Sequence, residues 1–215
     1  MDMKKCIAEF TGTALLMYMT NYAPHNPMVW GVSFAVLTFM FGADMNPAVS
    51  VAKIIKDPSS AAQNGANVGA QIVGSICGGF LFLINKAFEE TAMVAMSSTQ
   101  GAKTEQAVLT EIIITFVLVT IVFGASKATG GHFDALFVGM GYYLAYTMNA
   151  HASFNPAASF GGSLVNTFHG HSDGAWTNHW IFWVGPIVGA AIAAVYDKFL
   201  SAKGDEEEIA KEETI

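Results

Sequence analysis

Residues 45–50 read MNPAVS, and residues 154–159 read FNPAAS. The triplet Asn-Pro-Ala thus occurs twice in a chain of 215 residues that has only 6 prolines, each time after a long apolar stretch. Asparagine is a preferred N-cap, and proline is well tolerated at the first position of a helix, where its missing N–H has no partner to lose. Each triplet therefore predicts the start of a helix, capped by Asn46 and Asn155.

The composition around the triplets is that of an all-α integral membrane protein. Hydrophobic residues make up 53% of the chain and charged residues 13%, whereas soluble domains carry about 25% charged residues. A membrane helix needs about 20 apolar residues, and most of the segments that are nearly free of charge reach that length. These segments are 6–22, 28–52, 64–85, 107–126, 135–165 and 175–196. A soluble helical protein fits poorly, because little polar surface remains to be solvated.

The distribution of charge predicts an orientation and excludes one class of partner. Much of the net charge of −7 lies in the tail, residues 201–215, which we expect to be acidic and disordered. All ten basic residues are lysines and they form no patch, so a nucleic acid is not an expected partner. With six crossings and a cytoplasmic N terminus, eight lysines fall on the cytoplasmic side and two on the other, as the positive-inside rule requires. Both termini are therefore expected in the cytoplasm.

The chain also contains an internal repeat. AEFTGTALL (8–16) aligns with TEIIITFVL (110–118), and AQIVGSICGG (70–79) aligns with GPIVGAAIAA (185–194), with one Asn-Pro-Ala triplet between the two segments of each half. We predict one transmembrane domain over residues 1–200, built from repeats at about 4–88 and 105–200. Three crossings per repeat place the second repeat in the opposite orientation, which is an architecture of membrane transport proteins.

The helices that start at the triplets have about two turns, too few to cross a bilayer. Inside a membrane such a helix is tolerated only where it is buried in protein or lines a wet cavity. Related by the inverted repeat, the two helix starts are expected to meet near the midplane, where each is electropositive. The amide N–H groups of Asn46 and Asn155 are then expected to remain free as donors to a neutral solute. Ordinary capped helices in loops are the alternative.

With these motifs the chain resembles the aquaporins, the major intrinsic protein family. The resemblance covers roughly residues 6–200 and is carried by both triplets and by AEFTGT, VGAQIVG, TEIIIT and HWIFWVGPIVG. It implies six transmembrane helices plus two re-entrant half-helices, and a homotetramer with one pore per subunit. It further implies that Glu9 and Glu111 are buried carboxylates that brace the two loops, although headgroup-region glutamates are the alternative. The pore motifs that it implies are Asn46, Pro47, Ala48, Asn155, Pro156 and Ala157.

The outer selectivity filter departs from the family pattern. Water-selective members carry an arginine where this chain has Ala158, and the chain has no arginine elsewhere. The other filter positions implied by the resemblance are Trp30, Ala152 and Tyr143, or Tyr142 if the loop is slipped by one residue. Two aromatic side chains could narrow the space that alanine leaves open. Ordinary helix packing of these aromatics is the alternative.

The function implied by the resemblance is a passive water channel with single-file permeation past the two triplets. Ser159, where glycerol-conducting members usually carry an acidic residue, also favours water. A channel for ammonia, hydrogen peroxide or glycerol is the first alternative, and a non-conducting structural subunit of a larger membrane assembly is the second. Nothing in the sequence suggests an enzyme or a cofactor.

The outer loop contains His169, His171 and His179 near Asp173. This pattern could bind a metal, but solvated loop residues are the preferred interpretation, and we expect no metal site.

Overall fold

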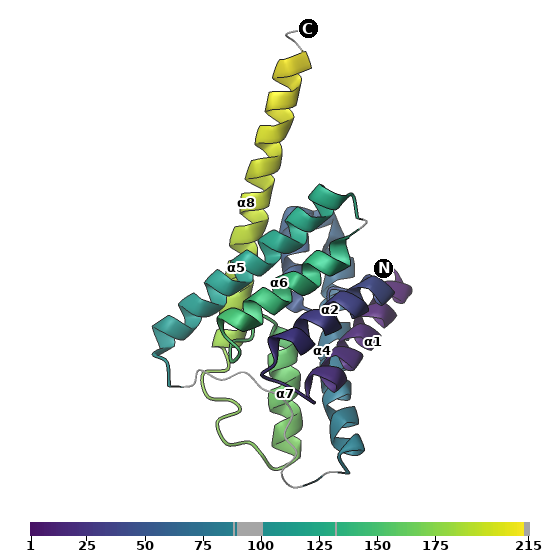
Figure 1. The fold of residues 1–215 in the computed structure, drawn as a ribbon, viewed down its shortest axis with the longest axis vertical. Helices are drawn as coiled ribbons and strands as arrows, with labels where there is room; N and C mark the ends of the chain where they lie inside the picture. Colours follow the sequence, from purple (N-terminus) through teal and green to yellow (C-terminus); the bar gives the residue numbers. More distant parts are fainter. Residues whose placement is uncertain (88, 90–100, 132, 213–215) are drawn as a thin grey trace.

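The computed structural model describes residues 1–87, 89, 101–131 and 133–212 (Figure 1). Every regular element among these residues is a helix, as the composition predicts. In chain order the elements are α1 (Met3–Thr20), α2 (Pro27–Phe41), α3 (Pro47–Lys56), the short 3-10 helix η1 (Pro58–Ser60), α4 (Ala61–Asn85), α5 (Thr104–Thr129), α6 (Asp134–Met148), α7 (Pro156–Phe168) and α8 (Ile181–Glu212).

Both Asn-Pro-Ala triplets start short helices, as predicted. α3 has 10 residues and α7 has 13, each with proline in its first turn. The side-chain oxygen of Asn46 accepts a hydrogen bond from the backbone N–H of Ala48, and that of Asn155 accepts from Ala157 and Ala158. The caps are therefore formed in both repeats.

The two repeats pack in equivalent ways. Where α4 crosses α1, a Cβ atom added to Gly74 would lie 2.5 Å from the backbone oxygen of Phe10. Where α8 crosses α5, the space beside Gly189 is closed in the same manner by the backbone oxygen of Ile112. Phe10 and Ile112 each follow the glutamate of their repeat. The alignment of the two halves thus holds in three dimensions, and glycine allows both helix pairs to approach closely.

α2 and α6, one helix from each repeat, cross at a pair of glycines. A Cβ atom on Gly31 would lie 2.9 Å from the backbone oxygen of Gly139, and one on Gly139 would lie 2.6 Å from the backbone oxygen of Gly31. Such a reciprocal contact is the mark of a two-fold relation. The axis that relates the two halves therefore passes through this crossing.

The lengths of the helices reflect their roles in a membrane. Among the residues that the structure describes, three helical segments are long and apolar enough to cross a bilayer by themselves: Pro58–Asn85, Thr104–Ala128 and Ile181–Leu200. α1 has 18 residues, and α2 and α6 have 15 each. α2 and α6 are shorter because each leads directly into the loop that precedes a half-helix.

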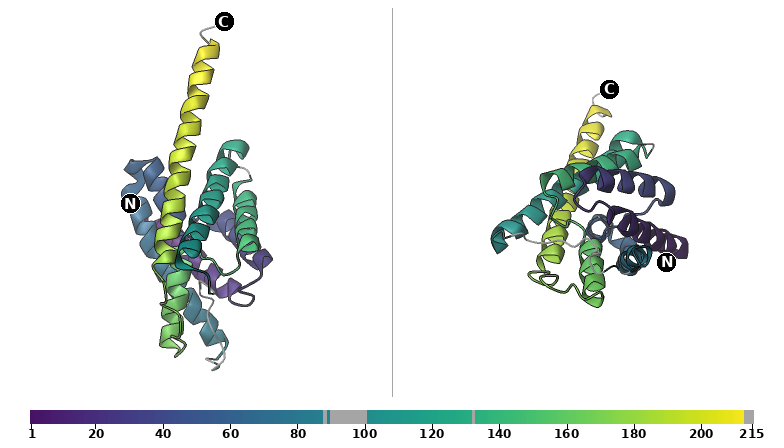
Figure 2. Two further views of the ribbon diagram at one scale, coloured as in Figure 1. Left: turned by 90° about the vertical axis from the view of Figure 1, so that its left-hand side faces the viewer. Right: turned by 60° about the horizontal axis from the view of Figure 1, so that its bottom comes forward.

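The C-terminal segment differs from the sequence prediction. We expected residues 201–215 to be disordered, whereas α8 continues as a helix to Glu212 and projects beyond the other helices in both views of Figure 2. Residues 201–212 are mostly alanine, glutamate and lysine, which are strong helix formers. The chain therefore continues the helix of the last crossing after it leaves the bundle.

Replacement of Gly74 by valine tests the close approach of α1 and α4. We expect Gly74→Val to destabilise the protein by about 1–3 kcal/mol, because the added side chain overpacks the crossing. Gly69→Val on the same helix is the control, since a Cβ atom there meets nothing within 4 Å. Thermal unfolding in detergent measures both variants. Equal losses of Tm would show that the crossing at Gly74 is not tightly packed.

Candidate pore

The loop before α3 is held by a buried carboxylate from α1. Glu9, which is 3% exposed, accepts the backbone N–H of Asp44 at 2.9 Å with Oε1 and that of Met45 at 2.8 Å with Oε2. Gln71 of α4 donates its amide to the same Oε2 at 2.9 Å and to the hydroxyl of Ser50 at 3.0 Å. The charge of Glu9 is thus surrounded by donors.

The loop before α7 is held in the same way from α5. Glu111, which is 2% exposed, accepts the backbone N–H of Ser153 at 2.6 Å and that of Phe154 at 2.7 Å. Met45 and Phe154 have φ angles of 52° and 37°, in the left-handed region that residues other than glycine seldom adopt. Each carboxylate therefore binds the N–H of a residue in an unfavourable conformation and fixes the turn into the half-helix.

The two half-helices meet at their starts. The side-chain amide of Asn46 donates to the backbone oxygen of Phe154 at 2.8 Å, and that of Asn155 donates to the backbone oxygen of Met45 at 2.8 Å. Both asparagines are completely buried. This reciprocal pair of bonds places all six residues of the Asn-Pro-Ala motifs together at the centre of the molecule.

One expectation about the asparagines has to be corrected. We expected their amide N–H groups to remain free as donors, but Asn46 uses both of its N–H groups. The first donates to Phe154, as described, and the second donates to the phenol oxygen of Tyr142 at 2.9 Å. The reason is that the opposite loop and α6 come within hydrogen-bond reach of the helix start.

Two pairs of stacked aromatic rings lie between α2 and α6. Trp30 stacks on Tyr146 with ring centroids 4.3 Å apart, and Phe34 stacks on Tyr142 with ring centroids 3.2 Å apart. All four side chains are buried. The indole N–H of Trp30 donates to the backbone oxygen of Pro24 at 2.8 Å, which fixes the plane of that ring.

The filter positions expected from the sequence occupy different surroundings. Trp30, Ala152 and Ala158 are buried, whereas the side chain of Tyr143 is 43% exposed. The inward-facing tyrosines of α6 are Tyr142 and Tyr146, and Tyr146 was not among the expected residues. The expected position on α6 was taken from the family pattern across the loop that joins α6 to α7. The signal that locates the inner face is the four-residue spacing of the two tyrosines, which matches that of Trp30 and Phe34 on α2.

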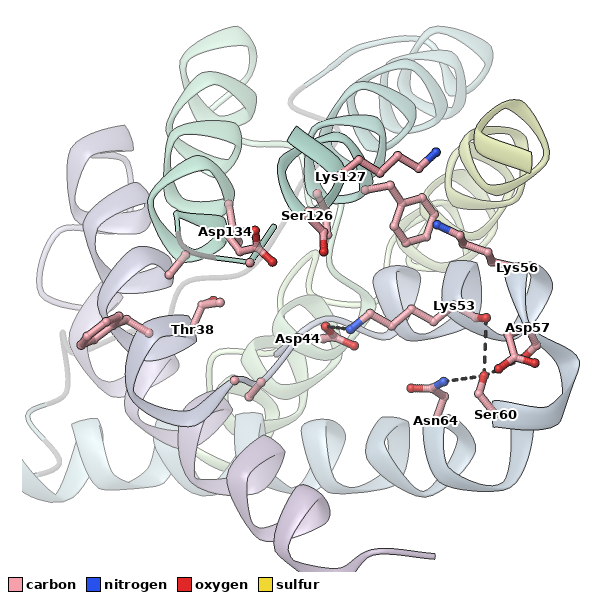
Figure 3. Close-up of a pocket in the computed structure, with 18 residues that line it drawn as sticks. Thr38, Asp44, Lys53, Lys56, Asp57, Ser60, Asn64, Ser126, Lys127 and Asp134 are labelled. Carbon is pink, nitrogen blue, oxygen red and sulfur yellow. Dashed lines mark hydrogen bonds and ion pairs between the residues drawn. The ribbon is translucent and has the colours of Figure 1, made fainter. Parts of the chain in front are cut away.

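A cavity of about 730 Å³ opens where α3 ends (Figure 3). We call it the vestibule, and its lining includes Thr38, Asp44, Lys53, Val122, Ser126 and Val138. Asp44 pairs with the ammonium group of Lys53 at 2.6 Å and accepts the hydroxyl of Ser50 at 3.3 Å. Asp44 is therefore part of the loop structure and neutralises a lysine at the entrance.

Ion pairs join three helices at the rim of the vestibule. Asp197 of α8 pairs with Lys56 of α3 at 2.7 Å and with Lys127 of α5 at 2.6 Å. Nearby, the hydroxyl and backbone N–H of Ser59 donate to Asp57 and hold the pKa of that carboxyl below its usual value. The end of the half-helix α3 is thus fixed to the rest of the bundle.

Histidines of the opposite end lie in pairs, and the rings of His169 and His171 are 5.1 Å apart. In the part of the chain that the structure describes, no three His, Cys, Asp or Glu side chains lie close enough to hold a metal ion. His179 packs against Phe160 and Trp176, and burial lowers its pKa. The ring of His151 lies 4.8 Å from that of His25, and its pKa is lowered by burial and then by the neighbouring histidine.

The chain is similar to known proteins over most of its length. The sequence profile described as Major intrinsic protein matches residues 1–196. The chain is 32% identical over 177 residues to Aquaporin-4 of Bos taurus, which covers 77% of this chain and 53% of that protein. It is 31% identical over 236 residues to Aquaporin PIP2-1 of Arabidopsis thaliana, which covers 90% of this chain and 79% of that protein. The chain spans about half the length of the aquaporin-4 relatives that it matches.

A solved structure shares the fold. The aquaglyceroporin of Plasmodium falciparum superposes with a TM-score of 0.80 at 20% sequence identity, over 94% of this chain and 98% of that one. At this identity the likeness concerns the fold alone.

Removal of a bracing carboxylate tests the architecture of the loops. Glu111→Ala leaves the backbone N–H groups of Ser153 and Phe154 buried without a partner, at about 1–3 kcal/mol each. We expect a large loss of Tm in detergent. Glu105→Ala is the control, because Glu105 is exposed in the first turn of the same helix and its removal costs about 0.3–1 kcal/mol. A similar small loss in both variants would contradict the bracing role.

Proposed function

Because this chain belongs to the major intrinsic protein family, we propose that it is a passive transmembrane channel for water. Molecules would pass in single file beside the contact between the starts of α3 and α7. The observation that carries the proposal is the reciprocal bond between the two half-helices, from Asn46 to Phe154 and from Asn155 to Met45. A bundle that only anchored itself in a membrane would not need two buried helix starts facing each other.

The electrostatics of this meeting point suit a neutral solute. The start of each helix carries about half a positive charge, so two such starts repel cations and protons and favour the oxygen of a small molecule. The buried carboxylates Glu9 and Glu111 are each held by two backbone N–H groups of a loop. We propose that these two glutamates maintain the pore without contacting the solute.

The proposed outer constriction consists of Trp30, Tyr146, Ala152 and Ala158. Without the filter arginine, this constriction offers aromatic faces and small apolar side chains in place of a fixed positive charge. Selection there would depend on the width of the passage. Water is favoured because the curated relatives include aquaporins from an animal and a plant. It is also favoured because glycerol-conducting members usually carry an acidic residue where this chain has Ser159, which is buried and hydrogen-bonded to the hydroxyl of Ser153.

The placement in the membrane is also part of the proposal. The vestibule carries Lys53, Lys56 and Lys127, and the excess of lysines marks the cytoplasmic side. We therefore propose that the vestibule and both termini face the cytoplasm. One transmembrane domain of two repeats over residues 1–200, assembled as a homotetramer, is the arrangement that the family resemblance supports.

The rate at which proteoliposomes shrink under osmotic stress, followed by stopped-flow light scattering, tests the proposal. We expect the purified chain to raise water permeability above that of protein-free liposomes. Val138→Trp is expected to return it to the lipid baseline, because Val138 lines the vestibule and an indole would fill the passage there. Met140→Trp is the matched control, since Met140 is 56% exposed on the same helix.

Two results would count against a water channel. If glycerol or ammonia crosses while water stays at the lipid baseline, the channel conducts a different neutral solute. If no solute crosses, the alternative of a non-conducting structural subunit is supported.

A further inference from the structure

The two ends of the passage occupy equivalent positions in the two repeats, but different side chains line them. Phe34 and Tyr142 occupy equivalent positions in the two repeats. Each follows by three residues one of the two glycines, Gly31 and Gly139, that the two-fold axis exchanges. One turn toward the outer end, Trp30 of α2 meets Tyr146 of α6.

One turn toward the other end, the equivalent positions are Thr38 and Val138, and both line the vestibule. The vestibule thus reaches the level of Thr38 and Val138, one turn short of Tyr142. Beyond it, the space between α2 and α6 is occupied by the stacked rings of Phe34 and Tyr142 and then by those of Trp30 and Tyr146.

Tyr142 occupies the place where a solute would contact Asn46. Its side chain is 1% exposed, its ring is stacked on Phe34 with planes only 2° apart, and its hydroxyl accepts the second N–H of Asn46 at 2.9 Å. In the proposed channel this N–H is the donor expected to receive the oxygen of a passing molecule. The phenol oxygen of Tyr142 therefore occupies the position that the oxygen of a passing molecule would take at Asn46.

We propose that Tyr142 determines access through the pore, as a permanently attached competitor for the hydrogen bond of Asn46. This inference rests on the proposed channel function. A molecule passes only when the ring leaves Phe34 and the molecule's own oxygen replaces the phenol at Asn46. The vestibule lies one turn along the same helix face and has room for the displaced ring, whereas the outer side is occupied by Trp30 and Tyr146.

This arrangement selects a solute class. The solute has to accept a hydrogen bond from Asn46, and it has to fit beside an aromatic ring that stays attached to α6. Water and hydrogen peroxide meet both conditions, whereas glycerol is too bulky to share the passage with the ring. The selectivity that an arginine gives elsewhere in the family would here depend on this tyrosine.

The experiment compares water permeability per reconstituted channel for the native chain and four variants. Tyr142→Val removes the ring and the hydroxyl, and we expect about a tenfold or larger rise, because the closed state loses its main contacts. Phe34→Val removes the stacking partner without touching Asn46, and a rise is expected there also. Tyr142→Phe removes only the hydroxyl and is expected to give about a fivefold rise, which corresponds to the free energy of one neutral hydrogen bond.

Tyr196→Val is the matched control for loss of a tyrosine from a transmembrane helix. Tyr196 lies on α8 and its side chain is 43% exposed, so its variant is expected to conduct like the native chain. Glycerol uptake is measured in parallel and is expected to appear in Tyr142→Val alone of the two tyrosine-to-valine variants. Circular dichroism in detergent verifies that each variant is folded.

The outcomes separate the two proposals. If the native chain and both Tyr142 variants conduct water equally above the baseline, the channel stands and the role of Tyr142 is wrong. If Tyr142→Val rises but Tyr142→Phe does not, the competition for Asn46 is wrong, because only the ring volume matters. If every chain, including Tyr142→Val and Phe34→Val, stays at the lipid baseline, the channel function itself is wrong and the role of Tyr142 with it.

Discussion

Asn46 and Asn155 each satisfy two demands with one side chain. The oxygen caps the asparagine's own half-helix, and the amide donates to the backbone of the opposite loop. Neither half-helix spans a bilayer, so each needs a partner for the polar groups at its buried start. Since each start provides what the other lacks, the two re-entrant segments stabilise each other, and the rest of the bundle is arranged around this contact.

The two glutamates follow from the same requirement. A loop that turns inside a membrane has backbone N–H groups that water cannot reach, and an unsatisfied group of this kind is costly. A carboxylate with two acceptor oxygens can serve two consecutive N–H groups, as Glu9 and Glu111 do. Its own burial becomes tolerable for the same reason. The repeat is not exact, however, because Gln71 of α4 also donates to Glu9, whereas the aligned position in α8 is Pro186.

The parts of this architecture that the sequence predicts are those with local signals. A helix start is marked by a cap and a proline within two residues, so Asn46 and Asn155 could be identified from the sequence. Glu9 and Glu111 could be identified because they coincide when the two halves of the chain are aligned. The register of α6 against the pore could not be obtained from the family pattern, because nothing in the loop between α6 and the second triplet fixes that register locally. Tyr146 was missed for this reason, and the helical extension to Glu212 was missed because charge content was given more weight than helix propensity.

The ion pairs of Asp197 have a mechanical consequence. By binding Lys56 and Lys127 together, one carboxylate ties the free end of α3 to two long helices, while Asn46 anchors its other end. Because α3 is held at both ends, it cannot tilt away from the bundle as a rigid body. Any permeation through the molecule would then be regulated by the rotation of individual side chains, which is fast and local, and not by a concerted movement of the helices.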